Sequence, residues 1–136
     1  MKKTIFIFLI ALLSSNILIG QTPDIYAKSF MEDVKTRGFE TALKYAVKDS
    51  VMSLPSKIEK LTQQYNKQRP KLGKYYGAEE VITDNNKVEC FVVKTYILKF
   101  ENAPTQLNLV FYKPNDKWLL HNVIIKKFNN NRRNRN

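Results

Sequence analysis

The 136-residue sequence contains one cysteine, one histidine and four glycines. A single cysteine, Cys90, excludes a disulfide within the chain, so stability has to come from packing. Cys90 stands in an apolar run and is expected to be a small buried residue rather than a reactive thiol. One histidine excludes ordinary multi-histidine metal sites, and no glycine-rich phosphate loop, nucleophile elbow or Ser-His-Asp pattern is present. The sequence therefore predicts no metal, no cofactor and no catalytic residue.

The longest apolar run is short and stands at the start of the chain. Lys2 and Lys3 precede the run from Ile5 to Leu13, and a membrane-spanning helix needs about twenty apolar residues. We therefore predict a secretory signal peptide over residues 1–20, cleaved after Gly20, with an uncleaved anchor as the alternative. The mature protein is expected in the periplasm or outside the cell. The remaining chain is long enough for one hydrophobic core, which predicts a single domain over residues 21–128.

The formal net charge is +11 at pH 7. Positive residues crowd at the end of the chain, where Lys126, Lys127, Arg132, Arg133 and Arg135 lie within eleven residues. Residues 129–136 contain no apolar side chain and are predicted to form a disordered basic tail. Such a tail is expected to make weak, nonspecific contacts with anionic surfaces. No nucleic-acid-binding motif accompanies the charge, so a dedicated nucleic-acid partner is not expected.

The first half of the chain has the apolar spacing of helices. Thr22 and Pro23 predict a helix start, with threonine as the N-cap and proline at the first helical position, and Gly38 is expected to end this helix. A second, short helix is expected to follow with Phe39 and Leu43 on its buried face. A third helix is expected to begin around Pro55 and to stop at Pro70.

The second half has the spacing of strands separated by turn residues. Four strands are expected, at about residues 78–83, 87–100, 106–113 and 117–127. Helices followed by strands predict an α+β fold, in which N-terminal helices pack on a four-stranded antiparallel meander; the resemblance described below adds the expectation that the sheet is curved and the shape cone-like.

Turn lengths predict which strand residues face the helices. If Glu101 opposes Thr105 and Lys113 opposes Lys117, the odd-numbered residues of the last three strands share one face. That face is nearly all apolar and is expected to be the core face. It consists of Phe91, Val93, Thr95, Ile97, Leu107, Leu109, Phe111, Leu119, His121, Val123 and Ile125.

Two polar residues stand in the middle of this predicted core face, Thr95 and His121. One interpretation is a ligand-binding cavity, in which Thr95 and His121 are surrounded by Phe91, Leu109 and Phe111. The alternative is that His121 is a core histidine whose ring is hydrogen-bonded to a backbone carbonyl or a tyrosine hydroxyl.

The even-numbered residues form a second face that is also rich in aromatic side chains. Tyr96, Tyr112, Trp118 and Leu120 have the composition that is favoured at protein interfaces, which predicts self-association as a homodimer. The alternative is that a strand or the first helix folds over this face and covers it.

Three segments carry a resemblance to a known superfamily: Arg37–Ala42 in the helical half, Leu72–Gly77 at the changeover, and the hairpin Tyr112–Leu120. With the order of helices and strands, they resemble small exported domains of the nuclear transport factor 2-like superfamily, which has a cystatin-like α+β cone. Enzymes of this superfamily, such as steroid isomerases and polyketide cyclases, typically use an acidic base and a polar donor inside the cone. This sequence departs from that pattern, because Asp84 and Asp116 stand in predicted turns.

We therefore expect an exported, noncatalytic domain that binds a small apolar ligand or a partner protein. One alternative is a self-associating interaction module whose cone is filled by side chains. A cavity enzyme of the isomerase or cyclase type is the less favoured alternative, because His121 is the only titratable group predicted inside the cone.

Overall fold

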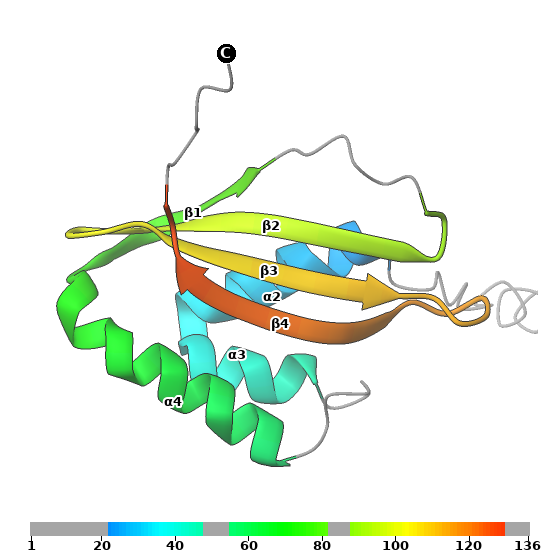
Figure 1. Ribbon diagram of the computed structural model, residues 1–136, viewed down its shortest axis with the longest axis horizontal. Helices are drawn as coiled ribbons and strands as arrows, with labels where there is room; N and C mark the ends of the chain where they lie inside the picture. Colours follow the sequence, from blue (N-terminus) through cyan, green and yellow to red (C-terminus); the bar gives the residue numbers. More distant parts are fainter. Residues whose placement is uncertain (1–21, 48–54, 82–87, 130–136) are drawn as a thin grey trace, which may run out of the picture.

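The computed structural model describes residues 22–47, 55–81 and 88–129, so the predicted signal peptide and residues 130–136 of the predicted tail lie outside the described residues. The described part contains three helices and four strands (Figure 1). In chain order these are α2 (Pro23–Arg37), α3 (Phe39–Ala46), α4 (Pro55–Leu72), β1 (Tyr75–Val81), β2 (Phe91–Phe100), β3 (Thr105–Tyr112) and β4 (Leu119–Lys127).

The four strands form one antiparallel sheet in the order β1-β2-β3-β4, in which every neighbouring pair is consecutive in the chain. The three helices lie on one side of this sheet (Figure 1). α2 contacts β2, α4 contacts β4, and α3 packs against both other helices. The predicted α+β meander is confirmed.

Local sequence signals set most helix boundaries where they were predicted. The Thr22 hydroxyl accepts a hydrogen bond from the backbone N–H of Ile25 at 3.4 Å and caps α2. Gly38 has φ 84°, a conformation that favours glycine, and it separates α2 from α3. α4 begins at Pro55, as expected.

The end of α4 differs from the prediction. Pro70 does not stop the helix, which continues to Leu72. Pro70 has no N–H to donate to the carbonyl of Asn66, and the helix extends only two residues beyond it. The helix ends instead before Gly73, which has φ 76°.

The core lies between the helices and the sheet. Phe39 of α3 stacks on Tyr65 of α4, with ring centroids 4.4 Å apart, and Tyr26 of α2 meets Phe111 of β3 edge-on at 5.4 Å. Buried apolar residues from α2, α3 and β2 to β4 complete this core. They include Ala27, Phe30, Val34, Leu43, Leu98, Leu107, Leu109, Leu120, Val123 and Ile125.

The predicted register between β2 and β3 is wrong. The last residues of the two strands that pair with each other are Leu98 and Thr105, so six residues, 99–104, lie beyond this pair instead of the predicted three. Changing the connection by an odd number of residues exchanges the two faces of β2. The even-numbered Tyr96, Leu98 and Phe100 are therefore buried, while the odd-numbered residues from Phe91 to Ile97 point to the other side.

Hydrogen bonds to a distant part of the chain explain this longer connection. The N–H of Glu101 donates to the carbonyl of Lys74 at 2.8 Å, and the N–H of Asn102 donates to the carbonyl of Leu72 at 2.9 Å. Phe100 pairs with Tyr75 of β1. The end of β2 is therefore held by β1 and by the end of α4, and it is not available for a tight turn into β3.

The register between β3 and β4 also differs from the prediction, because Leu109 pairs with Val123 rather than with His121, but a shift of two residues keeps the predicted faces of the strand. Val123 opposes Leu109 and Ile125 opposes Leu107, so both β4 residues face the core as expected. A bulge follows, because Val110 pairs with Asn122 whereas Phe111 pairs with Leu120. His121 is the extra residue of this bulge and is exposed, and Leu120 takes the core position beside Phe111. The predicted placement of His121 and Leu119 on the core face is therefore wrong.

Candidate functional site

The residues predicted to line a cavity lie on two sides of the sheet. Leu109 and Phe111 are buried in the core, at 0% and 1% exposure. Thr95 and Phe91 lie on the side of β2 that points away from the helices, and His121 is exposed at the bulge. The structure therefore brings Leu109 and Phe111 together, but it does not bring them together with the other three residues.

The residues predicted to form an interface are divided in the same way. Tyr96 and Leu120 belong to the core. Trp118 is half-buried against the core, with the ammonium group of Lys113 5.2 Å from the ring centroid. Only Tyr112 is substantially exposed, at 40%. Tyr96, Trp118 and Leu120 are thus packed in or against the core, and Tyr112 is not.

The exchange of faces gives the outer side of the sheet a different set of residues. We call this side, which carries none of the described helices (Figure 1), the open face. Strand pairing arranges its side chains in four rows across the sheet. The rows are Phe91–Tyr112–Leu119, Val93–Val110–Asn122, Val81–Thr95–Asn108–Ile124 and Glu79–Ile97–Gln106–Lys126.

Polarity changes along the open face. At one end, Phe91 and Tyr112 are cross-strand neighbours, and the ring of His121 meets that of Tyr112 edge-on at 6.1 Å. In the middle, Thr95 and Asn108 are paired and uncharged. At the other end, the residues on the two edge strands are charged; they are Glu79 of β1 and Lys126 of β4. The arrangement is a surface of apolar, aromatic and uncharged polar side chains with charges at its border.

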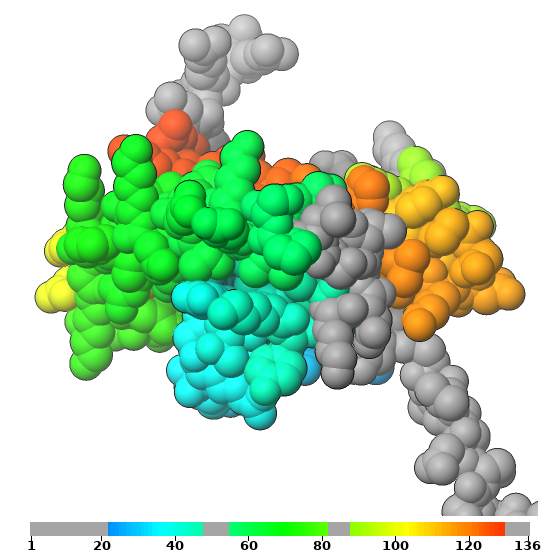
Figure 2. All heavy atoms as spheres, turned by 90° about the horizontal axis from the view of Figure 1, so that it is seen from below, coloured from blue at the N-terminus to red at the C-terminus, as the bar shows by residue number. Residues whose placement is uncertain are grey.

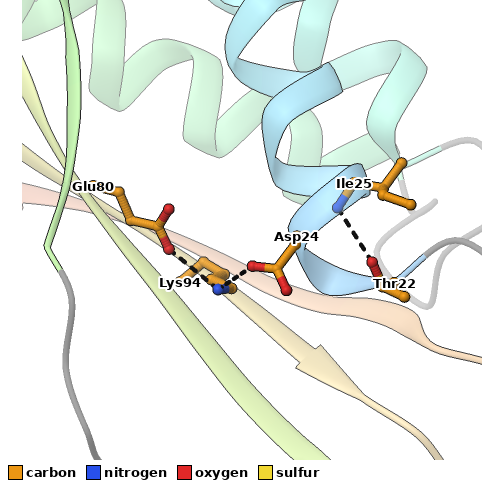
Figure 3. A network of polar contacts seen from close by, with 5 residues as sticks. All are labelled: Thr22, Asp24, Ile25, Glu80 and Lys94. Atoms are coloured by element: carbon orange, nitrogen blue, oxygen red, sulfur yellow. Dashed lines mark hydrogen bonds and ion pairs between the residues drawn. The ribbon is translucent and has the colours of Figure 1, made fainter.

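A separate polar cluster lies on the helix side of the sheet (Figure 3). Lys94 of β2 forms ion pairs with Asp24 in the first turn of α2 and with Glu80 of β1, the latter at 3.1 Å. The Lys94 side chain is 18% exposed, whereas that of Asp24 is 61% exposed. This cluster was not predicted, because the even-numbered residues of β2 were expected on the outer side of the sheet.

The electrostatics of this cluster favour a structural role. Burial lowers the pKa of Lys94, but the carboxylates of Asp24 and Glu80 outweigh burial and leave the pKa raised. A lysine acting as a base or nucleophile needs the opposite shift. Burial and the Glu80 charge also raise the pKa of the nearby Tyr96. Both side chains therefore keep their protons at neutral pH, and Lys94 connects α2 to two strands.

Over residues 22–47, 55–81 and 88–129, no group of three or more histidine, cysteine or acidic side chains is placed to hold a metal ion. None of the helices in those ranges is long and apolar enough to cross a membrane. Comparison with family models, with curated proteins and with solved structures gave no match. The resemblance to the nuclear transport factor 2-like superfamily therefore stays a prediction.

Proposed function

We propose that the protein is an exported, noncatalytic interaction domain that self-associates through the open face of its sheet. The observation that carries this proposal is the distribution of apolar side chains on that face. Phe91, Tyr112 and Ile124 are each about 40% exposed there, at 39%, 40% and 39%. Aromatic and branched apolar side chains gathered on one uncovered surface are typical of protein interfaces.

Packing inside the molecule supports an interaction domain over a ligand-binding cone. Leu109 and Phe111, two of the predicted cavity residues, are buried in the core, where the ring of Phe111 contacts that of Tyr26. The polar pair that suggested a ligand, Thr95 and His121, lies outside this interior. Export is proposed on the basic and apolar character of residues 1–20.

A second copy of the chain fits the open face better than an oppositely charged partner. The middle of the face is uncharged, so two copies can approach there although the chain carries a net charge of +11. Antiparallel sheets pack face to face at a spacing of about 10 Å. The self-complementary arrangement is a two-fold dimer, the commonest form of soluble oligomer.

The size of the face predicts a weak dimer. Four strands about 4.8 Å apart and about eight residues long, at about 3.4 Å per residue, give the face an area of roughly 500 Å². Two such faces bury roughly 1,000 Å² in total, at the low end of specific interfaces. We therefore expect a dissociation constant on the order of 10 μM.

The test compares two substitutions of the same kind. Ile124→Glu places a carboxylate on the open face, whereas Ile25→Glu places one on α2, where Ile25 is 50% exposed. Sedimentation equilibrium measures the dimer dissociation constant of each variant, expressed from the full sequence. Ile124→Glu is expected to weaken the dimer at least tenfold, and Ile25→Glu is expected to leave it unchanged, because only Ile124 lies in the proposed contact.

A second variant keeps the test decisive if Ile124→Glu fails to fold. Thr95→Arg places a cation in the middle of the open face, where two copies would bring like charges together. Folding of each variant is checked by its circular dichroism and thermal transition. The proposal is contradicted if a folded Thr95→Arg variant dimerises as well as the unmodified chain. It is also contradicted if the unmodified chain is monomeric at a protein concentration 200-fold above the expected dissociation constant.

A further inference from the structure

One side of α4 carries a row of four lysines that is interrupted once, by Gln64. Lys57, Lys60, Lys67 and Lys71 are all exposed, and with Gln64 between them they are spaced alternately three and four residues apart. At about 100° per residue this spacing keeps all five side chains within an arc of about 80°. We call these four lysines the α4 stripe. α4 faces the core with a different side, through Ile58, Leu61 and Tyr65.

The position of Gln64 places this stripe beside the end of β4. Its amide Nε2 donates a hydrogen bond to the backbone carbonyl of Ile125 at 2.9 Å. Lys127 follows Ile125 by two residues on the same side of the strand and is exposed, so it adds a fifth positive charge next to the stripe. Figure 2 shows α4 lying across this surface of the molecule, with the end of β4 along its border.

The charge of the stripe is not neutralised by neighbouring acids. In the described part of the chain, the ion pairs involve Arg37, Lys44 and Lys94 and none of the stripe lysines. Glu59 is the only acid in α4, and it accepts a hydrogen bond from Gln63, away from the stripe. α2 is different, because Asp24, Glu32 and Asp33 are interspersed with its lysines.

We propose that the α4 stripe, together with Lys127, docks the protein on an anionic membrane surface. Lys57 and Lys71 are separated by about 21 Å along a straight helix, at about 1.5 Å per residue. A straight row of lysines presents its charges in one plane, which matches a layer of lipid phosphates. The stripe contains no aromatic side chain on which the bases of single-stranded nucleic acid would stack.

This surface lies on the helix side of the molecule, so the proposal does not depend on self-association through the open face. Electrostatic attraction to an anionic lipid layer is salt-sensitive and falls off within a Debye length. A lysine close to such a surface contributes a factor of about five to the binding constant. Removing two stripe lysines is therefore expected to weaken binding about 25-fold.

The experiment measures sedimentation of the full chain with vesicles at low and high ionic strength. The vesicles are phosphatidylcholine alone or phosphatidylcholine with about one third phosphatidylglycerol, and the difference between the two isolates the electrostatic part. The test variant is Lys60→Gln/Lys67→Gln. The control is Lys28→Gln/Lys35→Gln on α2, which has the same seven-residue spacing and the same change in net charge.

We expect the protein to bind the anionic vesicles strongly and the phosphatidylcholine vesicles not at all, and we expect high salt to abolish the binding. Binding to the anionic vesicles should fall about 25-fold in the α4 variant and change little in the α2 variant. Equal weakening by both variants would overturn the proposal, because it would show a response to net charge alone. Unchanged binding in the α4 variant, with loss only when residues 130–136 are removed, would assign the attraction to the tail. Binding of a DNA duplex without binding of vesicles would overturn the membrane assignment.

Discussion

Lys94 of β2 is held between Asp24 of α2 and Glu80 of β1 and is the ionic connection between the helix layer and the sheet (Figure 3). Lys94→Met removes both ion pairs and leaves two solvated carboxylates without their partner. Because Asp24 is largely exposed, we expect a loss of only about 1 kcal/mol in the free energy of unfolding. Urea denaturation measures this loss. The control is Lys99→Met, because Lys99 is an exposed lysine on the same strand. Equal losses in the two variants would contradict a specific role for the ion pairs.

The contribution of Lys94 is expected to disappear at alkaline pH. The pKa of Lys94 is raised above its ordinary value of 10.5, with the two carboxylates outweighing burial. A raised pKa in the folded state means that the stabilisation is complete below pH 10.5 and is lost as the pH rises through the folded-state pKa. The difference in unfolding free energy between the unmodified chain and Lys94→Met should therefore be constant near neutral pH and shrink in this alkaline range. A difference that persists at higher pH would show that the stabilisation is not ionic.

Gly73 is expected to be much less tolerant of substitution than Gly38. Both have positive φ, 76° and 84°. A Cβ at residue 73 would lie 2.9 Å from the Cβ of Glu101, whereas a Cβ at residue 38 would meet no atom within 4 Å. We expect Gly38→Ala to cost about 1 kcal/mol for backbone strain alone, and Gly73→Ala to cost about 2–4 kcal/mol. Thermal unfolding of the two variants measures the difference, and equal transition temperatures would contradict the close approach at Gly73.

Substitutions in the predicted cavity set should separate into two classes. Leu109→Ala removes a fully buried side chain and is expected to cost about 2–5 kcal/mol. Thr95→Val and His121→Leu alter side chains on the open face and at the bulge, and each is expected to change the unfolding free energy by less than about 0.5 kcal/mol. Chemical denaturation gives these values. A large loss from His121→Leu would mean that the imidazole has a core role after all.

Signals that act over a few residues were sufficient to predict the helices. The N-cap at Thr22, the break at Gly38 and the start at Pro55 each depend on the conformational preferences of one or two residues. The number and order of strands also follow from turn chemistry between apolar runs. Pro70 was misjudged because the penalty of a proline depends on its position in the helix, which the sequence alone does not fix.

The two faces of β2 were not predictable in the same way. Phe91, Val93 and Ile97 alternate with Tyr96 and Leu98, so apolar periodicity does not distinguish one side of this strand from the other. The choice depends on hydrogen bonds between residues far apart in the chain, from Glu101 and Asn102 to the end of α4. The difference of three residues in this connection moved every side chain of β2 to the opposite face.

That single error accounts for most of the site residues that were misplaced. It put Thr95 inside the fold and Lys94 outside it, which hid the ion pairs with Asp24 and Glu80. The bulge at His121 added a second error, because an inserted residue leaves no clear signal in an apolar strand. The lysine spacing of α4 was visible in the sequence, as cations three and four residues apart with one acid among them.

The most direct test of self-association through the open face is residue-resolved methyl NMR with a soluble paramagnetic probe. The methyl signals of Ile97 and Ile124 report on the open face, and that of Ile25 reports on the helix side. We predict that raising the protein concentration protects Ile97 and Ile124 from broadening by the probe and leaves Ile25 accessible. Broadening of Ile97 and Ile124 that does not change with concentration, or protection of Ile25 instead, would contradict the proposed interface.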